Sequence, residues 1–228
     1  MSNRLLLNVS AKEMEIIRDS LEPIELRLKD VLSEPDEPIT HLYFPDSGVL
    51  SMVNEPDDGQ IVEFATVGPE GVGGFYALLG APSIPSRTMV QIPGYGRRAK
   101  IQQFIPLLEK MPKFRQTLMR YTVALLTQIA QGTSCNRLHE VQERCARWLL
   151  QTHDRVDGDT FPLTHEFLSQ MLGVHRPTVS VAAAILQKAG LIQYDRGIIT
   201  IVDRDGLEAA SCSCYKTITA EYRRLLGS

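Results

Sequence analysis

The chain has 228 residues, of which 43% are hydrophobic and 22% are charged, and its formal net charge is −3. These values are ordinary for a globular protein, and the length suits two small domains or one large one. No apolar run approaches the ~20 residues of a membrane-spanning helix. No signal peptide or disulfide framework is recognisable either, so we expect a cytoplasmic protein with no membrane partner.

The charge is distributed unevenly along the chain. Residues 1–94 carry 6 basic and 15 acidic side chains, whereas residues 95–137 carry 8 basic and 1 acidic, and residues 138–228 carry 10 and 11. This asymmetry indicates separate domains with different partners. The basic block consists of Arg97, Arg98, Lys100, Lys110, Lys113 and Arg115. We interpret it as a solvated face, with contacts to DNA flanks or to an anionic effector as the alternative.

Residues 24–94 have the pattern of an all-β domain. Short apolar and β-branched runs recur at Ile24–Leu28, Leu42–Phe44, Val49–Val53, Ile61–Val67 and Thr88–Ile92. Turn-forming residues separate them, including Asp57-Asp58-Gly59. Many short strands at this spacing are typical of a sandwich, roll or barrel. A short helix is expected before them, with Ser10 as its N-cap and its end before Pro23.

A long helix is predicted from about Pro112 toward Asn136. A heptad series runs along it, with steps of four and three residues, through Phe114, Leu118, Tyr121, Leu125, Gln128, Gly132 and Cys135. Such a seam pairs two helices side by side, so the first five of these residues are predicted to form a homodimer interface. The alternative is a helix packed on its own domain, with Leu126 and Ile129 supplying that contact.

The strongest pattern lies in residues 163–202. A short helix follows Thr164, its predicted N-cap, and Gly173 ends it where a residue with positive φ is needed. A second helix starts near Arg176 and stops at Gly190. Helix, glycine turn and helix at this spacing predict a helix-turn-helix. The β-rich runs 191–194 and 198–202 follow, around Asp195-Arg196-Gly197, and form a hairpin of the kind called a wing.

In such a module the second helix enters the major groove of DNA with its N-terminal residues against the base edges. The candidate DNA-binding residues are therefore Thr164, His175, Arg176, Thr178, Ser180 and Arg196. Arg176 can donate two hydrogen bonds to a guanine, and Thr178 and Ser180 suit phosphates or a thymine methyl group. Arg196 at the wing tip is placed for a backbone phosphate.

With these elements in order, the chain resembles the Crp/Fnr superfamily, the cyclic-AMP receptor protein and its relatives. The resemblance covers nearly the whole length, and its most specific parts are Arg144–Leu150, Leu163–Val202, Tyr43–Gly48 and Val67–Gly71. It implies an α+β fold with a β-roll like a cyclic-nucleotide-binding jelly roll in residues 1–111. A dimerisation helix would occupy 112–137 and a winged helix-turn-helix 138–228. It also implies a homodimer on a palindromic operator, contact with RNA polymerase, and no enzymatic activity.

The sequence departs from that family at the ligand site. Nucleotide-binding relatives hold the ribose with a glutamate, and here Phe75 stands in its place. Arg87 and Thr88 match the pair that holds the phosphate, but Ile129, on the long helix, offers a purine base no hydrogen bond. Phe75, Arg87, Thr88 and Ile129 are therefore the candidate effector pocket. We expect no cyclic AMP and no cofactor, and either a different small effector or none.

The four cysteines give only a weak pattern. Cys212-x-Cys214 is by itself a poor indication of a metal, because four ligands are usual for structural zinc or iron–sulfur sites. Cys145 is expected in the core. Cys135 falls on the predicted seam, where a pair across the two-fold axis would form a redox switch. We predict no metal ion.

No catalytic constellation is recognisable, so an enzyme is not expected. The sequence leaves two function classes open. The first is a DNA-binding transcription regulator. The second is a ligand-binding signalling module whose helical C-terminal part docks a protein partner, which would not need Arg176 and Arg196 on one surface.

Overall fold

The computed structural model describes residues 3–56 and 61–227, so the predicted turn at Asp57-Asp58-Gly59 lies outside the described residues. Two short helices begin the chain, α1 (Arg4–Leu7) and α2 (Ala11–Ile17), followed by the 3-10 helix η1 (Arg18–Ser20). The predicted N-cap is confirmed: Ser10 and Glu13 form a reciprocal capping box at the start of α2. Such a box satisfies two backbone N–H groups that would otherwise have no partner.

The β-rich segment folds into two antiparallel sheets. One has the strand order β1 (Glu22–Leu26), β7 (Gly94–Lys100), β3 (His41–Pro45). The other has the order β2 (Val31–Ser33), β6 (Arg87–Ile92), β4 (Val49–Asn54), β5 (Val62–Val67). The 3-10 helix η2 (Phe75–Leu79) and helix α3 (Ile101–Leu108) complete this roll. Phe44, Met52, Phe75 and Phe104 are fully buried in its core, which confirms the predicted β domain.

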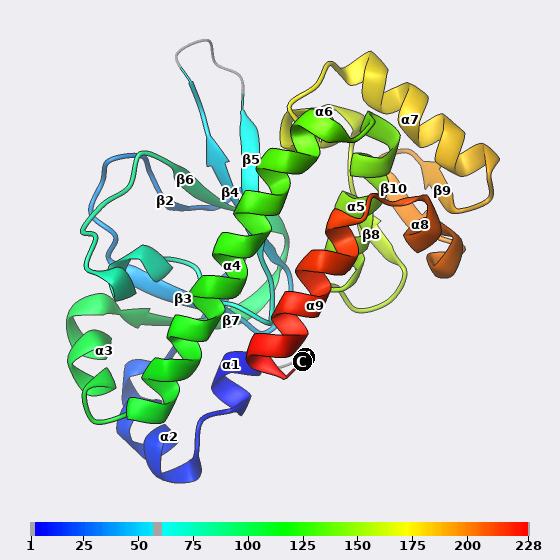
Figure 1. The fold of residues 1–228 in the computed structure, drawn as a ribbon. Helices are drawn as coiled ribbons and strands as arrows, with labels where there is room; N and C mark the ends of the chain where they lie inside the picture. The colour runs from blue at the N-terminus through cyan, green and yellow to red at the C-terminus, as the bar shows by residue number, and fades with distance from the viewer. Residues whose placement is uncertain (1–2, 57–60, 228) are drawn as a thin grey trace.

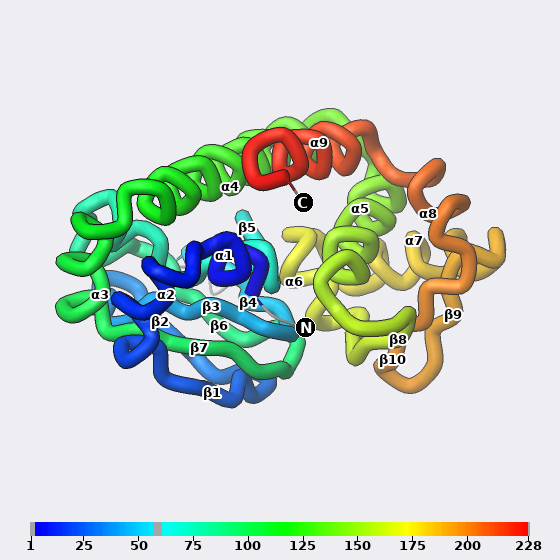
Figure 2. The backbone as a smooth tube through the Cα atoms, turned by 90° about the horizontal axis from the view of Figure 1, so that it is seen from below, coloured from blue at the N-terminus to red at the C-terminus, as the bar shows by residue number. Residues whose placement is uncertain are grey.

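Helix α4 (Pro112–Leu138) is 27 residues long and runs beside the roll to the C-terminal part of the chain (Figure 1). The last helix, α9 (Cys214–Leu226), lies alongside it, as Figures 1 and 2 both show. Ile218 and Tyr222 of α9 belong to the same core as the roll. The final helix of the predicted third domain therefore packs with the first domain.

The prediction that the heptad residues of α4 form a dimer interface is wrong, because these residues face the interior of their own chain. Phe114, Leu118, Tyr121, Leu125 and Gln128 are all buried within the single chain, against the roll and α9. Leu126, expected to face the roll, is 51% exposed, and Val123 is 48% exposed. A heptad series marks the face of a helix that is buried, but it does not say which element buries it. Here α9, more than 70 residues later in the chain, covers part of that face.

The winged-helix domain lies between α4 and α9 in the sequence. It consists of α5 (Val141–His153), β8 (Thr160–Pro162), α6 (His165–Leu172), α7 (Arg176–Lys188), β9 (Ile192–Asp195), β10 (Ile198–Ile201) and α8 (Arg204–Ala210). Its small sheet has the order β8-β10-β9. Trp148, Leu168, Val179 and Ile199 lie in a second core. Within residues 3–56 and 61–227, no helix combines the length and hydropathy needed to cross a bilayer.

Candidate nucleic-acid interface

The helix-turn-helix is built by local capping as the sequence predicts. The Thr164 hydroxyl accepts a hydrogen bond from the backbone N–H of Phe167 at 3.1 Å and so caps α6. Gly173 ends α6 with φ of +62°, a conformation that costs a residue with a side chain about 1 kcal/mol or more. His175 then stands at the N-cap of α7, and Pro177 lies in the first turn.

The N-terminal end of α7 is open to solvent. His175, Arg176 and Thr178 are exposed, while Val179 and Ala182 bury the opposite face of the helix in the second core. Ser180 is only partly exposed, and its hydroxyl lies 3.0 Å from Nδ1 of His165. A helix N-terminus with a basic side chain and no acidic residue in its first turn attracts phosphate oxygens.

The wing is the hairpin of β9 and β10, and a tight two-residue turn joins its two strands. Arg196 and Gly197 have φ of +48° and +84°, and Asp195 pairs with Ile198 on either side of them. Positive φ at both central residues is the geometry that joins twisted antiparallel strands. The side chain of Arg196 is exposed at this tip. A backbone N–H of Leu163 donates to the Gly197 carbonyl at 2.8 Å, so the wing tip is fastened beside the start of α6.

His165, which the sequence analysis did not single out, connects these parts. Its ring stacks on Tyr194 of β9, with 4.2 Å between ring centroids and 19° between planes. Burial and the nearby positive charge of Arg176 keep the pKa of His165 below its usual value, so the ring is neutral at pH 7. The start of α6 thus joins α7 on one side and the wing on the other, and brings Thr164, Arg176, Ser180 and Arg196 to one end of the domain.

Comparison with known proteins identifies this module. A family model described as the Crp-like helix-turn-helix domain matches residues 143–210. Those residues form a Crp-like helix-turn-helix domain. None of the curated proteins compared with the chain is similar to it in sequence.

Solved structures extend the likeness to the whole fold. FixK2 from Bradyrhizobium japonicum is 20% identical, with a TM-score of 0.72 over 85% of this chain and 98% of that one. A putative regulator of the Crp/Fnr family from Eubacterium rectale is 16% identical, with a TM-score of 0.69 over 90% and 96%. The c-di-GMP-responsive global regulator CLP from Xanthomonas campestris is 15% identical, with a TM-score of 0.68 over 84% and 99%.

At these identities the structures establish the fold alone. The predicted arrangement of sheet domain, long helix and helix-turn-helix is confirmed, and so is the resemblance in fold that it suggested. The chain therefore has the same fold as these solved structures, with a Crp-like helix-turn-helix domain at residues 143–210.

The Crp-like domain is docked on the roll through α5 and α6. The indole N–H of Trp148 donates to the carboxylate of Glu63 on β5 at 2.8 Å, and the Ser51 hydroxyl donates to the same carboxylate. Burial raises the pKa of Glu63 to about 7, although these two hydrogen bonds oppose the shift. A carboxyl group that titrates near neutral pH therefore lies at the contact between the two domains.

A second contact joins the Crp-like domain to the roll and to α4. The guanidinium of Arg155, just after α5, donates to Glu70 at 2.7 Å and to the Thr66 hydroxyl at 3.0 Å. It also donates to the Gln128 side chain on α4 at 3.2 Å, and the Tyr222 hydroxyl of α9 donates to the same Gln128 oxygen at 3.3 Å. Arg155, Glu70 and Gln128 are all buried.

The four residues of the predicted effector pocket do not together line either of the two cavities found among the described residues. The Arg87 guanidinium is paired with Glu34 at 2.8 Å and with Glu55 at 2.9 Å, so its charge is already neutralised. Phe75 is fully buried beside Tyr76, and Thr88 is buried as well. The sequence could not indicate these two carboxylates, because Glu34 and Glu55 come close to Arg87 only when β2 and β4 pair with β6 in the sheet.

Two cavities lie elsewhere among the described residues, and Phe75, Arg87 and Thr88 line neither. Ile129 lines the smaller one, of about 110 Å³, together with Glu63 and Trp148. The larger one, of about 550 Å³, lies where α5, α8 and α9 meet. Arg155, Arg204 and Tyr215 are among its lining residues, so a molecule in it would touch both the Crp-like domain and the helix that packs on the roll.

The structure also corrects the prediction for the cysteines. Cys135 is buried against Cys212 within the chain, with 3.3 Å between the sulfur atoms, so it cannot pair with its own copy across a two-fold axis. Cys135, Cys212 and Cys214 form a small buried cluster apart from both cores, whereas Cys145 lies in the core as expected. All four are free thiols.

Proposed function

We propose that the chain is a sequence-specific transcription regulator that binds a palindromic operator as a homodimer. The observation that carries this proposal is the exposed N-terminus of α7 in a Crp-like domain, with Arg176 at its first position. Arg176 is placed to recognise a guanine, and Thr164 and Arg196 to hold phosphates on either side. Val181, which is 61% exposed on the outer face of α7, is suited to contact a thymine methyl group.

The homodimer is proposed to form through the solvent face of α4 instead of the buried seam. Val123 and Leu126 are exposed apolar residues three positions apart, with Met119 and Ala130 one turn away on the same face. Two copies of α4 paired along this face bury those side chains and place two α7 helices for half-sites about one turn of DNA apart. Contact with RNA polymerase is proposed on the likeness of fold alone.

Cyclic AMP is not proposed as the effector. A phosphate needs a free cation, and the Arg87 guanidinium is already held by two carboxylates. A ribose hydroxyl needs an acceptor, and Phe75 supplies none. We propose the 550 Å³ cavity as the binding site of a small effector instead, because a ligand there would touch both domains.

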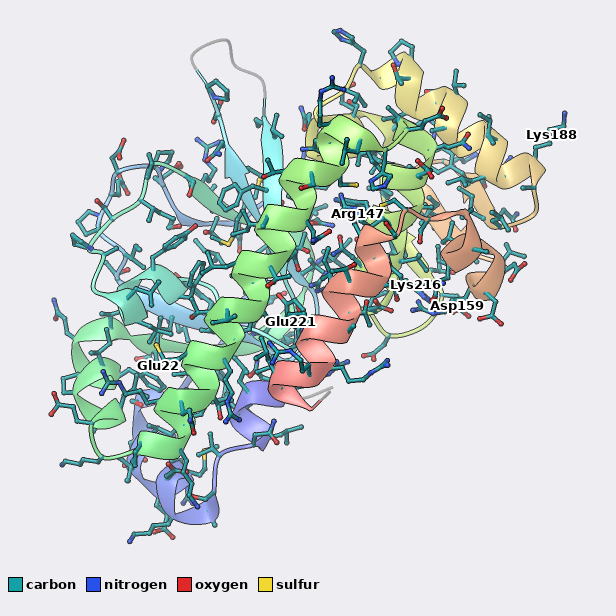
Figure 3. The ribbon with its side chains drawn as sticks, viewed as in Figure 1. Glu22, Arg147, Asp159, Lys188, Lys216 and Glu221 are labelled. Carbon is teal, nitrogen blue, oxygen red and sulfur yellow. The ribbon has the colours of Figure 1, made fainter. Side chains whose placement is uncertain are left out.

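The test is selection of bound sequences from a random pool of double-stranded DNA by the purified full chain without added ligand. An enriched palindrome supports the proposal. Arg176→Ala should relax the preference at one position of each half-site. Lys188→Ala is the matched control, because Lys188 is an exposed cation at the opposite end of α7 (Figure 3). Failure to enrich any sequence, with or without molecules that fill the cavity, would favour the second function class, a module that docks a protein partner.

A further inference from the structure

Four potential metal ligands converge at the junction of α4 and α9. Cys135 and His139 lie one helical turn apart at the end of α4, Cys212 lies in the turn between α8 and α9, and Cys214 is the first residue of α9. One ligand atom from each, three sulfur atoms and one imidazole nitrogen, lie within 4.8 Å of one another. The three cysteines are at most 3% exposed and His139 is half-buried.

The spacing of these atoms fits a tetrahedral zinc ion. Zinc–sulfur bonds of ~2.3 Å and zinc–nitrogen bonds of ~2.0 Å give tetrahedron edges of roughly 3.5–3.8 Å. The Cys135 and Cys212 sulfur atoms are 3.3 Å apart, and the Cys214 sulfur is 3.7 Å from Nδ1 of His139. The other pairs of ligand atoms are no more than 4.8 Å apart, so a contraction of about 1 Å or less along those edges brings all four atoms within bonding distance of one ion.

The type of ligand selects the metal. Thiolates favour zinc over the hard cations magnesium and calcium, and three cysteines with one histidine are a common set for structural zinc. An iron–sulfur cluster would hold its thiolates farther apart, because several iron and sulfide atoms stand between them.

The surroundings provide a compensating charge. Three thiolates, one neutral imidazole and one zinc ion carry a net charge of −1. The cation Arg147 lies beside Cys135, and Figure 3 shows it between α4 and the first turn of α9. Its Nε is buried and has no hydrogen-bond partner among the described residues, so a donor remains for a metal-bound sulfur. Buried donors of this kind are normally satisfied, and a thiolate ligand would satisfy this one.

We propose that Cys135, His139, Cys212 and Cys214 bind one structural zinc ion that fastens both ends of the winged-helix domain to α4. The domain lies between the two ligand pairs, which are 77 positions apart at Cys135 and Cys212. Metal bonds that close so long a loop stabilise the folded chain by restricting the unfolded one. The consequence for operator binding rests on the proposed function, whereas binding of the metal does not.

The first test measures metal and thiols in the full chain purified under reducing conditions. We expect one zinc ion per chain by elemental analysis. Alkylation with N-ethylmaleimide should modify none of the four thiols while zinc is bound, and should modify Cys135, Cys212 and Cys214 once a chelator removes it. Cys145 should stay protected in both states, because it lies in the second core, outside the cluster of proposed ligands, and burial there raises the pKa of its thiol to about 12. No bound metal, together with the same alkylation before and after the chelator, would overturn the proposal.

Cobalt provides a second readout that does not depend on any variant. Wild-type chain stripped of metal and titrated with Co²⁺ should develop the visible bands of a tetrahedral ion and the near-ultraviolet bands of thiolate ligation. Zinc should then displace the cobalt. Octahedral bands, or an iron–sulfur spectrum in the protein as purified, would contradict a zinc site at these residues.

Variants then assign the ligands. Cys212→Ser should weaken zinc affinity by at least about 100-fold, and Cys145→Ala, the matched control, should leave one zinc ion per chain. Stoichiometric zinc in the double variant Cys212→Ser, Cys214→Ser would refute the assignment. These measurements involve no DNA, so their failure is distinct from a failure of the proposed regulator function.

Discussion

Arg155 and Glu70 form a buried ion pair, 2.7 Å between Nε and Oε1, that joins the winged-helix domain to the β-roll. Their side chains are 8% and 9% exposed. An ion pair so enclosed gains little net stability over apolar residues of the same size, because both charges lose their water. The pair instead fixes how the two domains sit against each other, because a shift of either domain would leave one charge buried without its partner.

Removal of one member of that pair should therefore cost much more than removal of both. Arg155→Met leaves the Glu70 carboxylate unpaired and should lower the free energy of unfolding by about 3–5 kcal/mol. The double variant Arg155→Met, Glu70→Leu should recover much of that loss. Chemical denaturation of the four proteins of the cycle measures both values. Additive effects would show that the two side chains do not interact.

Stability should also depend on pH through Glu63. Its folded pKa of about 7 lies above the ordinary value of 4.5, so the folded chain holds a proton that the unfolded chain releases between these values. The contribution of Glu63 is then complete below pH 4.5 and is lost as the pH rises through 7, on the order of 3 kcal/mol in all. Across that pH range the free energy of unfolding of Glu63→Gln should decrease less than that of the wild type. The exposed control Glu25→Gln should follow the wild type.

The dimer should dissociate when the solvent face of α4 is made acidic. Leu126→Glu places one charge from each copy in the proposed interface and should raise the dimer dissociation constant by at least about 10-fold. Leu7→Glu serves as the control, because Leu7 is equally apolar and 68% exposed but lies on α1. Analytical ultracentrifugation gives both constants. If Leu126→Glu remained as dimeric as wild type, the interface would lie elsewhere.

Cyclic AMP should not stabilise the chain. A ligand of the folded state raises the unfolding temperature in proportion to the logarithm of its concentration. We expect no rise at millimolar cyclic AMP, because Glu34 and Glu55 occupy the Arg87 guanidinium. Differential scanning fluorimetry measures this directly. A rise that disappears in Arg87→Ala would show that the nucleotide displaces both carboxylates.

Affinity for a selected operator should depend on Arg176. Loss of a bidentate contact with guanine costs about 1–3 kcal/mol, so Arg176→Ala should weaken each half-site by roughly 5- to 150-fold at fixed salt. Fluorescence anisotropy with the matched operator and with one base pair changed at the affected position measures the effect. Equal losses on both DNAs would assign Arg176 to a phosphate instead of a base.

The sequence alone determined the features that depend on local chemistry. The capping of α2 by Ser10 and of α6 by Thr164 follows from neighbouring residues, as do the Gly173 turn and the wing around Arg196. Alternation and turn residues predicted the roll, and their order along the chain pointed to the Crp/Fnr-like fold. Each of these patterns extends over a few residues, so the backbone has little choice in how to satisfy them.

Only the tertiary structure decided which surfaces meet. The seam of α4 was recognisable as a buried face, but α9 and the roll cover it in place of a second chain. Arg87 matched a phosphate ligand in sequence, yet Glu34, 53 positions away, holds it. Cys135 and Cys212, 77 positions apart, are brought into contact. Such pairings depend on how whole elements pack, and periodicity within one element carries no information about its partner.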